Sequence, residues 1–204
     1  MLMKISLVKC IMSINGGISM NLYNFYTKIL KIQNTEILKE LIEVSKYESL
    51  DKGKIIVREG DDNVTRTHFL LKGIIRGFFI DDEGNEITDC FCTKCGSPTI
   101  VRYGLNIIPA VTLEALTECE IITIPLSKID ELQQKYIEVD LIYNNLLLTA
   151  FAEHWEAKTI LYRFNAMERY KWFLNKYPGL IDKISKKYIA SFLYNSCYIK
   201  QITE

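Results

Sequence analysis

The sequence predicts an α+β fold, with helices on both sides of a small β barrel or sandwich. Between Lys54 and Ile124, short apolar runs of strand length alternate with turn sequences, as in a small closed β structure. Before and after this region, apolar residues recur every three or four positions, which indicates amphipathic helices. With 204 residues, 49% of them hydrophobic, the chain is long enough for one sizeable core or two small ones.

The N-terminal part predicts an extension followed by two short helices. Lys4 and Lys9 interrupt the first apolar run and no small-residue cleavage site follows, so residues 1–20 are interpreted as a poorly ordered extension rather than a signal peptide. Residues 21–46 have helical apolar spacing that is broken near Asn34 and Thr35.

Six strand-like runs follow. They are Lys54 to Val57, Phe69 to Leu71, Ile74 to Ile80, Glu86 to Cys92, Val111 to Leu116 and Glu120 to Ile124. The turn "DDEGN" places Gly84 where a positive φ is easiest, so the runs on either side of it should form a tight antiparallel hairpin.

The pattern becomes helical again at Ser127 and predicts one long helix to Phe164. Within it, apolar and small residues alternate at spacings of three and four, as in a two-stranded seam: Leu147, Ala150, His154, Ala157 and Leu161. We therefore expect these residues at a dimer interface. The alternative is that this face packs on its own β domain. No second histidine, cysteine or carboxylate lies at the spacing of a metal site around His154 in the sequence. We therefore expect a packed or interfacial histidine rather than a metal ligand.

The C-terminal part predicts a helix to Tyr177, a stop at Pro178-Gly179, and a new helix capped by Ser185. Its apolar face should hold Tyr188, Ile189, Phe192 and Leu193. From residue 166 to the end, seven basic residues face three acidic ones, a balance of +4 in a chain whose formal net charge is zero. The C-terminal segment is therefore the basic part of the protein.

Composition and motifs argue against several classes of protein. Six irregularly spaced cysteines suit reduced thiols in a cytoplasm rather than a secreted disulfide framework. No run of eighteen apolar residues exists to span a membrane. Serine-triad, zinc-protease, Walker and Rossmann patterns are absent, so no catalytic residues are predicted and an enzyme is the weakest interpretation.

The order of parts resembles the CRP/FNR family of bacterial transcription regulators. The resemblance rests on "KGKIIVREGD", "FLLKGIIRGFFIDDEGNEI" and "ISKKYIASFL", and covers roughly residues 21–193. It implies a homodimer in which a cyclic-nucleotide-binding-like β-roll, or jelly roll, walls a pocket for a small effector. The implied parts are a β-roll domain at 21–126, a long dimerisation helix at 127–164 and a small helix-turn-helix domain at 165–204.

The family's effector pocket is altered here. Members that bind cyclic nucleotides supply a Gly-Glu pair and an arginine after the hairpin; the pair is absent, and the arginine position falls on Ile108 or Pro109. Cyclic AMP in the usual mode is therefore not expected. A different anionic effector could be bound by Gly96, Ser97, Thr99 and Arg102, through backbone N–H groups and the guanidinium. Alternatively, Arg102 is a solvated loop residue or the pocket is purely structural.

Three cysteines, Cys90, Cys92 and Cys95, form C-x-C-x2-C, with Cys119 as a further candidate neighbour. Some relatives hold an iron–sulfur cluster through cysteines, but mainly in an N-terminal cluster, where this chain has only Cys10. Residues 90 and 92 should face the same side of one strand. We interpret these cysteines as small buried hydrophobes and expect no metal or cofactor.

The implied DNA partner would meet Lys186, Lys187 and Lys200. Only "CYIKQITE" follows the turn after the last predicted helix, too little for a family recognition helix and wing. The sequence thus predicts a shortened helix-turn-helix with weak, salt-sensitive DNA binding. The rival interpretation is a stand-alone ligand-binding or interaction module without DNA binding, in which these lysines are an ordinary solvated face.

Overall fold

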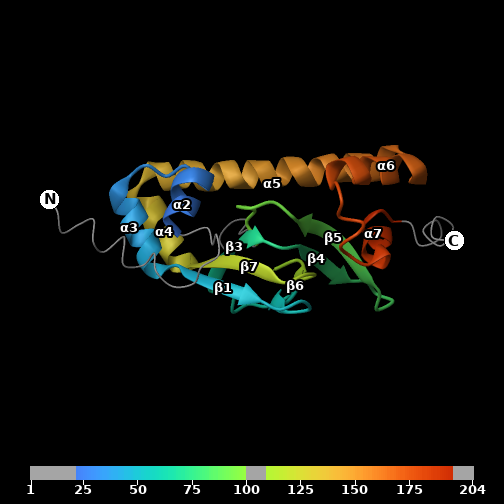
Figure 1. Ribbon diagram of the computed structural model, residues 1–204, viewed down its shortest axis with the longest axis horizontal. Coiled ribbons are helices and arrows are strands. Elements are labelled where there is room, and N and C mark those ends of the chain that lie inside the picture. Colours follow the sequence, from blue (N-terminus) through green and yellow to red (C-terminus); the bar gives the residue numbers. More distant parts are fainter. Residues whose placement is uncertain (1–21, 100–108, 195–204) are drawn as a thin grey trace.

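The computed structural model describes residues 22–99 and 109–194. Two antiparallel sheets form a β-roll, with a group of helices at one end and one long helix lying along the roll (Figure 1). The predicted α+β architecture is confirmed. The N-terminal extension, Arg102 and Lys200 lie outside the described residues.

The N-terminal helices fold as predicted, with a break before Thr35. They are α2 (Leu22–Asn24), the π-helical turn η1 (Phe25–Ile29) and α3 (Thr35–Val44). Asn34 caps α3, because its side-chain oxygen accepts hydrogen bonds from the N–H groups of the first helical turn. Their apolar faces form one core cluster with Ile122 and Leu132.

The first sheet has the order β1-β7-β3 and the second the order β2-β6-β4-β5. The strands are β1 (Lys46–Leu50), β2 (Ile55–Val57), β3 (Arg66–Lys72), β4 (Ile75–Ile80), β5 (Glu86–Cys92), β6 (Thr112–Ala115) and β7 (Cys119–Pro125). Both sheets contribute to one inner core, for example Leu70 and Ile121 from the first and Ile75 and Leu113 from the second. The sheets are thus the two walls of a closed roll.

The hairpin β4–β5 carries an irregularity that positions the candidate site. Gly77 pairs with Cys90, whereas the next residue, Phe78, pairs with Thr88. Asp89 is therefore an extra residue in β5, a β-bulge. At the hairpin turn, Gly84 has a φ of 84°, as predicted. The backbone N–H of Asn85 donates a hydrogen bond to the Asp81 carboxylate, and this bond is the main cause that lowers the pKa of Asp81.

The single long helix predicted from Ser127 is wrong in one respect: it is two helices, α4 (Leu126–Lys135) and α5 (Ile137–Arg163). Tyr136 separates them with extended backbone angles, φ −134° and ψ 113°. The break lets α4 bury Leu132 in the N-terminal core while α5 runs along the roll. Among the described helices, none is both long and apolar enough to cross a lipid bilayer.

The C-terminal helices are α6 (Ala166–Lys176) and α7 (Lys186–Phe192). The predicted apolar face of α7 is confirmed: Ile189, Phe192 and Leu193 are buried in a cluster with Phe91 of β5. Ser185 occupies the N-cap position, but its side chain makes no capping hydrogen bond. The C-terminal helices therefore pack directly on the β-roll of their own chain.

Candidate effector pocket between the β-roll and helix α5

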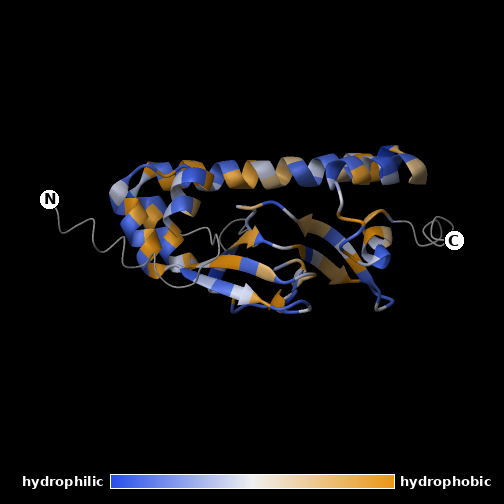
Figure 2. Ribbon diagram, in the orientation of Figure 1, coloured by the Kyte–Doolittle hydropathy of each residue, from blue (hydrophilic) through white to orange (hydrophobic). Residues whose placement is uncertain are grey.

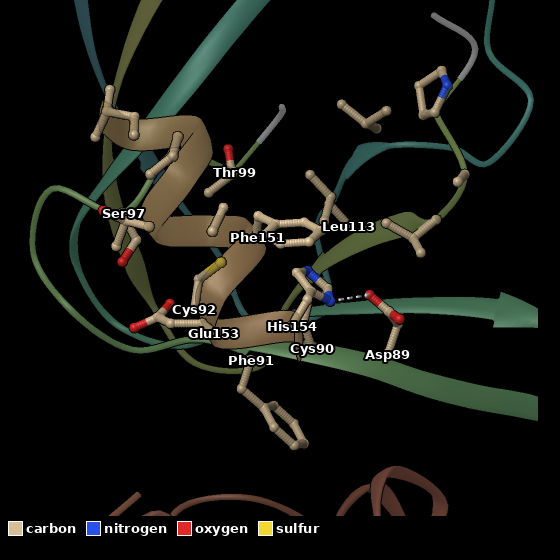
Figure 3. Close-up of a pocket in the computed structure, with 18 of the residues that line it drawn as sticks. Asp89, Cys90, Phe91, Cys92, Ser97, Thr99, Leu113, Phe151, Glu153 and His154 are labelled. Atoms are coloured by element: carbon tan, nitrogen blue, oxygen red, sulfur yellow. Dashed lines mark ion pairs between the residues drawn. The ribbon is translucent and has the colours of Figure 1, made fainter. Parts of the chain in front are cut away.

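A cavity of about 1070 Å³ lies between β5, the segment that follows it, and α5 (Figure 3). Residues 89–92, 94–99 and 109–111 line one side, and α5 contributes side chains from Leu146 to Ala157. Three predicted effector residues, Gly96, Ser97 and Thr99, are brought together in this lining. The cavity is thus where the sequence placed a pocket.

The predicted way of binding an anion does not fit the loop geometry. The N–H groups of Gly96 and Thr99 donate to the carbonyl oxygens of Leu70 (2.7 Å) and His68 (2.8 Å), and that of Ser97 donates to Lys94 (3.2 Å). The donors of Gly96 and Thr99 hold the loop on β3, and the donor of Ser97 closes a turn within the loop. A ligand in the cavity would therefore meet side chains of this loop, and their role in effector binding stays a prediction.

The charges of the described lining residues also disfavour an anion. Asp89, Asp130 and Glu153 are acidic, against Lys94 and His154. The one lysine is paired, because its Nζ lies 2.8 Å from a Glu153 carboxylate oxygen. Within the described part of the lining, nothing resembles the arginine fork that holds a phosphate.

Cys90 and Cys92 face the same side of β5, as predicted, and both line the cavity. The hydrogen bond between the two thiols, together with burial, raises the pKa of Cys90. The same hydrogen bond lowers the pKa of Cys92. Cys119 is buried elsewhere: its Sγ lies 3.4 Å from the carbonyl oxygen of Ile74, and it is not a cavity residue.

The predicted dimer seam on α5 faces its own chain. Ala150, His154 and Ala157 line the cavity, and Ala157 and Leu161 pack on the C-terminal core cluster. Leu147 is half-buried. Nδ1 of His154 lies 3.9 Å from Oδ2 of Asp89 on β5. This arrangement agrees with the alternative that this face packs on the β domain, and the predicted role of these residues in a dimer stays a prediction.

A different stripe of α5 is left exposed. Hydrophobic residues occur along the whole helix (Figure 2). The exposed ones are Ile137, Leu141, Leu148, Phe151, Trp155 and Tyr162. Leu141, Leu148, Trp155 and Tyr162 recur at intervals of seven residues, with Ile137 and Phe151 at the intermediate positions of the heptad. Tyr162 is 79% and Leu148 is 65% exposed.

Arg76 is a second site that the sequence did not single out. Its side chain is completely buried, and its guanidinium carbon lies 4.3 Å from the ring centre of Phe78 and 4.1 Å from that of Tyr188 on α7. Its Nη1 donates to Glu86 (2.8 Å) and Glu114 (3.4 Å). The charge is thus compensated by two carboxylates and two aromatic faces. Arg76 joins β4 to the C-terminal helix.

Ser191 makes a second connection between α7 and β5. Its hydroxyl accepts a hydrogen bond from the N–H of Thr88 (2.8 Å) and donates one to the carbonyl oxygen of Glu86 (2.9 Å). The helix N-terminus carries the two predicted DNA-binding residues that lie among the described ones, Lys186 and Lys187, and both are exposed.

His68 should make stability depend on pH. It lies on β3, its Nδ1 is buried with no hydrogen-bond partner, and burial lowers its pKa to about 4. The neighbouring charges are smaller causes: Glu48 raises the pKa and Arg66 lowers it. Between pH 4 and 6.5 the unfolded chain binds more protons than the folded one, so stability rises with pH in this window. Acidification from pH 7 to 5 should therefore cost about 2 kcal/mol.

Urea unfolding of the wild type and of His68→Gln at several pH values checks this expectation. The variant cannot titrate at position 68. As the pH falls, the free energy of unfolding of the wild type should therefore decrease more than that of His68→Gln. A difference that stays constant from pH 7 to pH 5 would show that His68 titrates normally in the folded protein.

The architecture is similar to that of solved proteins, although the sequence alone finds no relative. The sequence matches no protein-family model and no curated protein. Among solved structures, a transcriptional regulator of the CRP/FNR family from Eubacterium rectale is 21% identical with a TM-score of 0.70, over 87% of this chain and 84% of that one. FixK2 from Bradyrhizobium japonicum is 16% identical with a TM-score of 0.68, over 78% and 85%.

A third structure is the c-di-GMP responsive global regulator CLP from Xanthomonas campestris. It is 13% identical to this chain with a TM-score of 0.65, over 83% of this chain and 92% of that one. At such low identities the likeness concerns the fold. The chain has the fold of CRP/FNR-type regulators, which confirms the fold that the sequence resemblance implied.

Proposed function

We propose that this protein is an effector-responsive transcription regulator of CRP/FNR type that acts in the cytoplasm as a homodimer. The fold supports the proposal, because this chain covers 84% of the Eubacterium rectale regulator and 92% of the regulator CLP. An effector in the cavity would touch both β5 and α5. Its binding would thus change how α5 lies on the roll, and the two α5 helices of a dimer would carry this change to the DNA-binding ends.

The exposed heptad stripe of α5 is the observation that carries the proposal. An apolar stripe that repeats every 3.5 residues fits a partner helix of the same kind, because only a supercoiled pair keeps such a seam in contact. With 27 residues, α5 is about 40 Å long. A second copy supplies a helix of matching length and pattern. The dimer seam we propose is therefore rotated by one residue, about 100°, from the one that the sequence predicted.

The charge variant Leu148→Glu tests the dimer. Two carboxylates facing each other in an apolar seam are costly, so the wild type should sediment as a dimer and the variant as a monomer at the same concentration. Ile80→Glu is the matched control, because Ile80 is an apolar residue on β4 that is 49% exposed outside α5. A monomeric wild type, or a dimeric Leu148→Glu, would contradict the proposed seam.

DNA binding is tested separately by charge reversal of Lys186 and Lys187. If these exposed lysines contact phosphates, the double variant should bind promoter-length DNA more weakly. The slope of log K against log salt should also become shallower by roughly 0.9 for each lost contact. Reversal of Lys52 and Lys54, exposed lysines beside β2, is the control and should leave the slope unchanged. An unchanged slope in the α7 variant would argue against DNA contact there.

The rival function, a ligand-binding or interaction module without DNA binding, is favoured by one observation. α7 is held on the β-roll by the Arg76 and Ser191 contacts described above. Such contacts are expected if α7 only covers the β-roll and does not bind DNA. Titration with DNA at physiological salt separates the two functions: a sequence-selective complex excludes the module, whereas complete absence of binding with an intact dimer favours it.

A further inference from the structure

Three side chains with metal-binding atoms meet at the rim of the cavity. Asp89 and Cys90 come from β5 and His154 comes from α5, and one ligand atom from each lies within 4.8 Å of the other two. In Figure 3, His154 points across the cavity toward Asp89, and Cys90 lies below them on the strand. No other group of this kind occurs among residues 22–99 and 109–194.

The bulge in β5 makes the arrangement possible. In a regular strand, consecutive side chains point to opposite faces, so Asp89 and Cys90 would diverge. Because Asp89 is the extra residue opposite β4, both side chains are directed to the face that α5 covers. His154 then completes the group from above, with its Nδ1 3.9 Å from the Asp89 carboxylate. Two separate elements of the fold thus supply the three ligands.

The ligand types select the kind of metal. A thiolate, an imidazole and a carboxylate together suit zinc or a similar divalent transition ion, whereas calcium and magnesium prefer oxygen ligands alone. At zinc–ligand lengths of about 2.0 to 2.3 Å, tetrahedral ligand atoms lie about 3.5 Å apart. The observed group needs a small inward movement of His154 to reach this distance. Its side chain is 46% exposed and has room to move.

We propose that Asp89, Cys90 and His154 bind one divalent transition metal ion of the zinc type. A tetrahedral ion with three protein ligands keeps one position for water or a small ligand. All three proposed ligands line the cavity. The ion would link β5 to α5, the helix that carries the exposed heptad stripe. The metal site itself lies within one chain, so it does not depend on dimerisation or on DNA binding.

Cobalt(II) titration of the full, reduced chain tests the site. Cobalt bound by a thiolate gives a charge-transfer absorption, so the wild type should show this band and saturate at one ion per chain. Cys90→Ser should abolish the band, and His154→Ala and Asp89→Asn should each weaken binding at least tenfold. His154 is exposed on α5, so His154→Ala should fold normally, as circular dichroism will show.

Cys92→Ser and Cys119→Ser are the matched controls. Cys92 is the neighbouring cavity cysteine, and a serine there can keep the hydrogen bond to Cys90; Cys119 is buried outside the cavity. Both variants should therefore keep the band, and Cys119→Ser should also keep the affinity. Three results would overturn the proposal: no thiolate band in the wild type, a band that survives Cys90→Ser, or full affinity in His154→Ala. Loss of the band in Cys92→Ser would also overturn it, because a cysteine pair would then hold the ion.

Discussion

Arg76→Ala should lower the free energy of unfolding by about 3 to 5 kcal/mol. The substitution leaves Glu86 and Glu114 without their shared cation and empties the space between two aromatic rings. Glu114 is only 18% exposed, so its carboxylate cannot be fully hydrated after the loss. Because one ring of this stack belongs to Tyr188, the change should also loosen α7 from the roll.

Urea unfolding measures the first effect and hydrogen exchange the second. Amides of α7 should exchange faster in Arg76→Ala, even under conditions in which the β-roll stays folded. Lys72→Ala is the control, because the Lys72–Glu120 pair is solvent-exposed and should contribute less than about 1 kcal/mol. Arg76→Lys keeps the charge but not the planar fork, so it should recover only part of the loss. A loss below about 1 kcal/mol in Arg76→Ala would mean that hydration replaces the network.

Much of the fold could be predicted because local signals agree with the final structure. The break before Thr35 was visible in the periodicity, and the structure shows Asn34 capping the helix there. The hairpin was visible because Gly84 permits the positive φ that the turn needs. The apolar face of α7 followed from helical spacing. Each of these signals depends on residues within a few positions of one another.

Other features depend on contacts that local patterns do not contain. Strand β1 (Lys46–Leu50) was missed because it is mostly exposed and has no apolar alternation; its pairing with β7 is made by the backbone. The break at Tyr136 was missed because the apolar spacing continues through it. Here tertiary packing decides: Leu132 of α4 and Val139 of α5 are buried in the same N-terminal core, and beyond it α5 runs along the roll and lines the cavity.

The candidate site shows the same limit. Gly96, Ser97 and Thr99 line the cavity, and their role in effector binding stays a prediction. The N–H groups of Gly96 and Thr99 are bonded to β3 and that of Ser97 to Lys94, which a sequence pattern cannot show. The predicted dimer seam faces its own chain here, and small residues such as Ala150 and Ala157 fit an interface and an intramolecular contact equally well, so the pattern alone could not distinguish the two. Asp89 was missed because strand alternation sends it away from Cys90, and only the bulge reverses this.

Gly73→Ala should destabilise the fold by about 4 kcal/mol. Gly73 joins β3 to β4 with a φ of 105°, a conformation that a residue with a side chain rarely adopts. An added Cβ would also lie 2.5 Å from Sγ of Cys119, 2.6 Å from the carbonyl oxygen of Glu118 and 2.9 Å from Cα of Cys119. Two of these three atoms are backbone, so the connection between β6 and β7 would have to move.

Gly53→Ala separates the two causes. Its φ of 85° imposes a similar conformational cost, but no atom lies within 4 Å of the added Cβ, so a loss of only about 1 kcal/mol is expected. Removing Sγ with Gly73→Ala/Cys119→Ala should restore little stability, because the clashes with backbone atoms remain. Denaturant unfolding of all variants at one protein concentration keeps the contribution of any dimer equal. Equal losses in Gly73→Ala and Gly53→Ala would mean that backbone conformation alone, and not the close contact of the two connections, makes glycine necessary at position 73.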